Sequence, residues 1–120
     1  MLYIAGALTV LIGCAHSYLG EKYILRRLVR EDNLPPLFGG EVSAPKILRF
    51  AWHLTTIAWW GFAVLLFMLV RTPLSPALVG QVIAIVFGIH SLITLAASRG
   101  RHPAWIVFLL IAILSWMASC

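Results

Sequence analysis

Four long stretches of the chain contain no charged residue, and they constrain its fold more than any other feature. They cover residues 2–20, 50–70, 77–98 and 104–120. A helix needs roughly 20 apolar residues, at about 1.5 Å of rise each, to cross a bilayer core about 30 Å thick. Only 11% of the residues are charged, whereas a soluble domain carries about a quarter. We therefore predict a single-domain, all-α membrane protein, an up-and-down bundle of four transmembrane helices.

The region between the first two stretches has two parts. In residues 21–31, apolar and basic positions alternate as in an amphipathic helix at a membrane surface, so the first helix is predicted to extend through them. Residues 32–44 contain paired prolines and paired glycines and are predicted to form a loop. Ser75 and Pro76, directly before the third stretch, are typical of a helix start.

The basic residues are divided unevenly between the two ends of the predicted helices. Of the nine Lys and Arg residues, all except Arg71 lie in or beside the connections between the first and second stretches or the third and fourth. Cytoplasmic loops of membrane proteins carry an excess of Lys and Arg. We therefore expect both termini to face the non-cytoplasmic side (N-out, C-out) and the basic ends to contact anionic lipid headgroups. Lipid contact explains the net charge of +5 without a nucleic-acid partner.

Small and polar residues form one stripe along the first predicted helix. The stripe consists of Gly6, Thr9, Gly13, His16 and Gly20. Residues three and four positions apart share a helix face, and small residues let two helices approach closely in a membrane. From this stripe we expect helix packing, and we predict a homo-oligomer or a complex with a partner membrane subunit.

All four histidines are predicted to lie in the half of the bilayer next to the basic ends. His16 and His53 lie at similar depth, about one helical turn or roughly 6 Å below the charged ends. His90 lies deeper, and His102 lies at the interface. Polar residues inside a bilayer usually face the bundle interior. The four histidines therefore define a candidate site, with Glu21 at its rim.

Two kinds of cofactor fit this candidate site. Imidazole is a common metal ligand, and a haem in a helical bundle takes two axial histidines at matched depth on different helices. We predict a transition-metal ion held by the histidines and the rim carboxylate, or haem b between His16 and His53 with Arg49 at its propionates. Ser17, Thr56, Ser91 and Thr94 are candidates to orient the rings. Either cofactor would serve redox chemistry or electron transfer. The alternative is that each histidine only hydrogen-bonds a neighbouring helix.

Two other functions are open from the sequence, which assigns no enzyme activity. A non-catalytic accessory or scaffold protein would use the tryptophans of the second stretch as anchors. A small transporter would need a polar path from Gln81 to the histidines. All four acidic residues lie in or beside the first loop, so a buried carboxylate like that of small four-helix multidrug exporters is missing. No nucleophile–base pair, phosphate-binding loop or dinucleotide fingerprint is recognisable.

Three segments together resemble a group of small, uncharacterised four-helix membrane proteins of bacteria. They are residues 16–21 (HSYLGE), 48–55 (LRFAWHLT) and 100–105 (GRHPAW). The resemblance covers nearly the whole chain. It implies a four-helix fold in the bacterial inner membrane, and it implies no activity, ligand or functional residue.

Overall fold

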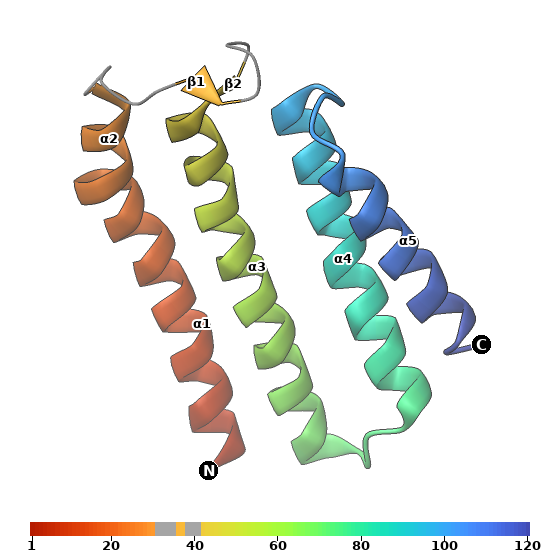
Figure 1. The fold of residues 1–120 in the computed structure, drawn as a ribbon. Helices are drawn as coiled ribbons and strands as arrows, with labels where there is room; N and C mark the ends of the chain where they lie inside the picture. Colours follow the sequence, from red (N-terminus) through yellow and green to blue (C-terminus); the bar gives the residue numbers. More distant parts are fainter. Residues whose placement is uncertain (31–35, 38–41) are drawn as a thin grey trace.

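The computed structural model describes residues 1–30, 36–37 and 42–120, and long helices run antiparallel through it (Figure 1). In chain order the elements are α1 (Leu2–Leu19), the π-helical turn η1 (Gly20–Leu25), α2 (Arg26–Arg30), β1 (Pro36–Leu37), β2 (Val42–Ser43), α3 (Ala44–Arg71), α4 (Pro76–Ser98) and α5 (Ala104–Met117). The segment from α1 to α2 is one continuous rod, because η1 joins the two without a break. The two short strands pair antiparallel.

Three helical segments are long and apolar enough to cross a membrane. They are Leu2–Leu28, Lys46–Arg71 and Pro76–Ser98. Helix α5 is also apolar but has only 14 residues, which gives about 21 Å of helix. The prediction of an all-α protein with membrane-spanning helices is thus confirmed for three of the four stretches, by length and composition.

The helices lie side by side in a row (Figure 1). Helix α1 packs along α3, α4 packs along α5, and α3 meets α4 in the middle over a less extensive contact. The molecule measures 50 × 32 × 15 Å along its principal axes, and its thinnest dimension is close to the width of one helix with side chains, about 10–12 Å. The up-and-down order agrees with the prediction, but the molecule is an open layer of two helical hairpins and not a closed bundle.

The glycines of the predicted stripe pack against large rings of α3. Three buried glycines follow one another two helical turns apart on the α1–η1 rod, and each faces one aromatic side chain. The pairs are Gly6–Phe67, Gly13–Trp60 and Gly20–Trp52. Association in a bilayer depends on close packing, because lipid tails are as apolar as the side chains. The glycines of the stripe therefore pack against α3 of the same chain, and the predicted oligomer stays a prediction.

The two hairpins meet through α3 and α4. Gly61 lies against Val86, whose Cγ2 would come within 2.6 Å of a Cβ added to the glycine. The His90 ring reaches from α4 to α3, where Nε2 lies 3.0 Å from the carbonyl oxygen of Leu54. A small residue and a polar contact thus contribute to the junction of the hairpins, and the Phe50 and His102 rings also meet there, with 6.2 Å between centroids.

Several helix boundaries agree with the sequence analysis. The Ser75 hydroxyl accepts a hydrogen bond from the Leu78 amide at 3.1 Å and caps α4, as predicted. The extension of the first helix is present as far as Arg30, while Glu31 lies outside the described residues. Helix α3 begins at Ala44, the last residue of the predicted loop, and the described part of that loop contains the β1–β2 pair.

We expect Gly13→Ala to destabilise the α1–α3 contact. The new Cβ would lie 2.7 Å from Trp60 Nε1, so the indole or the helices must move, at a cost of about 1–3 kcal/mol for overpacking. The matched control is Gly88→Ala, because nothing lies within 4 Å of an added Cβ there. Unfolding in increasing sodium dodecyl sulfate, followed by circular dichroism, should give a lower midpoint for Gly13→Ala only. Equal midpoints would show that this contact is loose.

Candidate functional site

Five polar side chains meet where α1 and η1 face the first half of α3. We call this group, Ser17, Glu21, Arg49, His53 and Thr56, the Glu21–His53 cluster. Ser17 and Glu21 are one turn apart on one face, and the three α3 residues share a face by the same periodicity. The ring–glycine packing brings the two helices close enough for these faces to make direct contact.

The Ser17 hydroxyl lies between two side chains of α3. Its Oγ is 2.8 Å from Thr56 Oγ1 and 3.0 Å from His53 Nδ1. Thr56 is only 2% exposed, and its hydroxyl also lies 3.5 Å from the carbonyl oxygen of Gly13. When His53 carries its proton on Nε2, the Ser17 hydroxyl donates to Nδ1 and the Thr56 hydroxyl donates to Ser17.

The Glu21 carboxylate is held at the other end of the cluster. Arg49 donates to it twice, from Nε to Oε2 at 3.0 Å and from Nη2 to Oε1 at 2.5 Å. Arg26 Nε lies 3.8 Å from Oε1, and His53 Nε2 lies 3.5 Å from Oε2. A two-point arginine–carboxylate contact fixes direction as well as distance. Arg49 therefore holds the carboxylate beside the imidazole.

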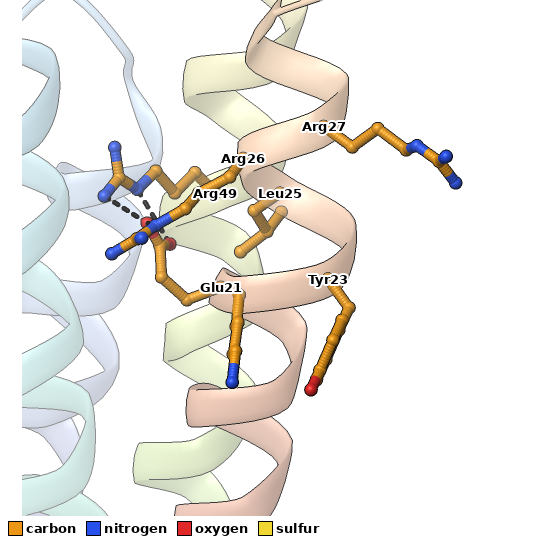
Figure 2. A pocket seen from close by; sticks show the side chains of 7 residues that line it. Glu21, Tyr23, Leu25, Arg26, Arg27 and Arg49 are labelled. Atoms are coloured by element: carbon orange, nitrogen blue, oxygen red, sulfur yellow. Dashed lines mark hydrogen bonds and ion pairs between the residues drawn. The ribbon is translucent and has the colours of Figure 1, made fainter.

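A cavity of about 680 Å³ opens beside this carboxylate (Figure 2). It is lined by Glu21, Lys22, Tyr23, Leu25, Arg26, Arg27 and Arg49. Figure 2 shows Arg26 and Arg49 turned towards Glu21, whereas Arg27 points away from them. The described lining therefore carries four cationic side chains and one carboxylate.

His16, one of the two predicted haem ligands, makes a separate set of contacts. Its Nε2 lies 3.0 Å from Thr55 Oγ1, and its ring stacks on Trp52 with 4.4 Å between centroids. The Trp52 indole in turn donates to the His16 carbonyl oxygen at 3.0 Å. His16 and His53 thus contact different residues, although both lie between α1 and α3.

His90 and His102 are also engaged elsewhere. His90 is 7% exposed, and its Nδ1 lies 2.6 Å from the Val86 carbonyl oxygen while Nε2 faces Leu54. Both of its nitrogens thus face oxygen acceptors of the backbone. His102 Nδ1 accepts from the Ala104 amide at 3.2 Å, at the start of α5.

The predicted histidine cluster is not supported. Among the described residues, no group of three or more His, Cys, Asp and Glu side chains is placed to hold a metal ion. The structure brings together His53, Glu21 and Arg49, and it leaves His16, His90 and His102 in separate contacts. A haem between His16 and His53 would have to displace the hydroxyls that both rings contact. The described residues therefore give no support to the predicted metal site, and the haem hypothesis stays a prediction.

The structure also contains a pairing that the sequence analysis missed. We found no nucleophile–base pair in the sequence, yet the Ser17 hydroxyl lies within hydrogen-bond distance of His53, with a carboxylate next to the other ring nitrogen. The available signal was the spacing of Ser17 and Glu21 on one helix and of Arg49, His53 and Thr56 on the next. This spacing becomes informative only when the two helices are known to be partners.

Comparison of the chain with protein-family models, with curated proteins and with solved structures gives no match. The resemblance to small bacterial four-helix membrane proteins therefore stays a prediction. The function of the cluster has to be inferred from its own geometry.

We expect the purified protein to bind neither Zn²⁺ nor haem stoichiometrically. The ring nitrogens of His16, His53 and His90 already face polar partners, so a ligand must break contacts that an open site would not have. Isothermal titration with Zn²⁺ and absorption spectra during haemin addition would measure this. A 1:1 complex that His16→Ala or His53→Ala abolishes would contradict the expectation and restore the cofactor hypothesis.

Proposed function

We propose that this chain is a bacterial inner-membrane protein that binds the phosphate of an anionic phospholipid at its basic end. The observation that carries the proposal is the cavity beside Glu21, whose described lining has four cationic side chains and one carboxylate, a net charge of +3. Phospholipid headgroups are the anions that a membrane places at the end of a spanning helix. Anionic lipids attract such basic segments by about 1 kcal/mol for each Lys or Arg near the surface.

The proposed topology has four spans, with both termini outside and the basic end in the cytoplasmic leaflet. Arg49 and Arg71 lie towards opposite ends of α3, and the other Lys and Arg residues belong to the same end of the molecule as Arg49. The excess of positive charge favours the cytoplasmic side for that end. Helix α5 is shorter than the other spans, and a bilayer adapts to a short span by thinning locally.

The arginines keep hydrogen-bond donors available for a phosphate. A guanidinium has five N–H groups, and Arg49 uses two nitrogens, Nε and Nη2, on Glu21. The carboxylate thus fixes the orientation of the guanidinium without using all its donors. Arginine suits phosphate because its planar donors match two oxygens at once. Glu21 would therefore organise the site rather than neutralise it.

Lys22 contributes charge from an interfacial position. Its Nζ lies 5.7 Å from the Tyr18 ring centroid and 5.1 Å from that of Tyr23, which is a cation–π arrangement. Tyrosine is enriched at membrane–water interfaces. The pair of tyrosines supports placing the cavity at the level of the headgroups.

We expect the protein, purified in a non-ionic detergent, to bind dihexanoyl phosphatidylglycerol more tightly than dihexanoyl phosphatidylcholine. Arg26→Gln should weaken binding of the anionic lipid about fivefold, the equivalent of about 1 kcal/mol for one basic residue. This variant leaves the Arg49–Glu21 contact in place. Calorimetric titration gives the affinities, and added salt should weaken binding of the anionic lipid.

Arg71→Gln is the matched control, because it removes the same charge from the opposite end of α3. Its affinity for the anionic lipid should equal that of the wild type. Inorganic phosphate, as a further ligand, tests whether the anion alone is recognised, and we expect it to bind more weakly than the lipid. Equal affinity for the two lipids, or equal losses in Arg26→Gln and Arg71→Gln, would refute the proposed site.

A further inference from the structure

The Glu21–His53 cluster contains the parts of an activated serine nucleophile. We propose that Ser17 Oγ attacks an ester carbonyl of a glycerophospholipid, with His53 as the base and Glu21 as a positioning residue. This inference rests on the proposed headgroup site, which would hold the lipid. The substrate class is thus an anionic glycerophospholipid, and the reaction is hydrolysis of one of its acyl esters.

The contacts match what nucleophilic catalysis by serine requires. A base must be within hydrogen-bond reach of the hydroxyl, and a third group must orient the base. Ser17 Oγ lies 3.0 Å from His53 Nδ1, and the Glu21 carboxylate lies 3.5 Å from Nε2. Serine proteases use the two ring nitrogens in the opposite order, but either nitrogen of a neutral imidazole can be the acceptor.

The anchored carboxylate is what sets this group apart from a simple contact between helices. The Ser17 and Thr56 hydroxyls are 2.8 Å apart and could link α1 to α3 without His53. A carboxylate 3.5 Å from Nε2 favours the tautomer that carries its proton on Nε2, and this tautomer leaves Nδ1 free to accept the Ser17 proton. The carboxylate also stabilises the positive charge that the ring gains when it takes that proton.

The depth of Ser17 fits the position of a lipid ester. Ser17 is one helical turn, about 6 Å, further from the basic end than Glu21. In a glycerophospholipid, the ester carbonyls lie directly below the phosphate. A phosphate held at Arg26 and Arg49 would therefore place an ester near Ser17. Ser17 is half-buried, and the His53 side chain is 37% exposed.

The proposed reaction has two steps. First, Ser17 Oγ bonds to the carbonyl carbon while His53 Nδ1 takes the hydroxyl proton. The ester bond to the glycerol oxygen then breaks, and His53 gives that oxygen the proton.

In the second step, water attacks the acyl group on Ser17. His53 takes a proton from the water and returns it to Ser17 Oγ as the acyl–oxygen bond breaks. The products are a fatty acid and a lysophospholipid. The whole sequence consumes one ester and one water and needs no oxidant, reductant or metal ion.

Covalent labelling tests the nucleophile directly. We expect an alkyl fluorophosphonate to modify the wild-type protein in phosphatidylglycerol-containing vesicles, and peptide mass spectrometry to locate the adduct on Ser17. Ser17→Ala should lose the label. Ser91→Ala is the matched control, because the Ser91 hydroxyl donates to the Trp105 carbonyl oxygen in the other hairpin, and it should keep the label.

Hydrolysis is measured as hexanoate released from dihexanoyl phosphatidylglycerol. We expect Ser17→Ala to release none above background and His53→Gln to lower the rate by at least about 100-fold, as for loss of a general base. Binding of dihexanoyl phosphatidylglycerol should be unchanged in Ser17→Ala, which also shows that this variant is folded. A wild-type protein that binds this lipid but neither labels at Ser17 nor releases hexanoate overturns the inference and leaves the headgroup site standing. Failure to bind the lipid selectively overturns the headgroup site itself.

Discussion

The contact between the glycines of α1–η1 and the rings of α3 determines where almost every polar group of the cluster lies. Gly20 lets the Trp52 ring sit directly on the helix, and the ring fills the space that a larger side chain would take. The same indole donates to the His16 carbonyl oxygen and stacks on the His16 ring. With the helices held this closely, Ser17 reaches His53 without a bridging water. The packing therefore comes first, and the polar contacts depend on it.

The polar contacts are confined to one end of the α1–α3 pair. An unsatisfied polar group is costly within a bilayer, and among the described residues the cluster ends at Thr56, whose hydroxyl is close to both Ser17 and the Gly13 carbonyl. Further along α1, Thr9 donates to its own helix at Ala5, and Phe67 then lies beside Tyr3. The described side chains thus give no continuous polar path along the α1–α3 contact.

Periodicity and composition were sufficient to predict the apolar helices and the glycine stripe. They could not predict which helix faces which, because a helical period identifies a face and not its partner. His16 and His53 illustrate the difference. Their depth was predicted as equal, and both do lie at the α1–α3 contact, but one ring turns to Thr55 and the other to Ser17. The equal depth of the two histidines therefore suggested a shared site, but their rings point to different partners.

The π-helical turn from Gly20 to Leu25 could not be predicted from the sequence pattern either. Such a turn closes its hydrogen bonds over five residues, so it rotates the following side chains relative to a regular α-helix. Glu21 and Arg26 belong to this turn and its end, and both reach the same cluster. An assignment based on a strict helical period misplaces side chains that follow such a turn.

The arrangement around Glu21 joins several charged groups at one point. One carboxylate faces Arg49, Arg26 and His53. An isolated exposed ion pair contributes only about 0–1 kcal/mol, and the two-point contact with Arg49 is the geometry in which such a pair is stronger. Ordering long arginine side chains also costs conformational entropy. The glycine–ring contacts already hold α1 against α3 over most of their length. The cluster therefore places a carboxylate, an imidazole and a hydroxyl next to one another on a pair of helices that other contacts already hold.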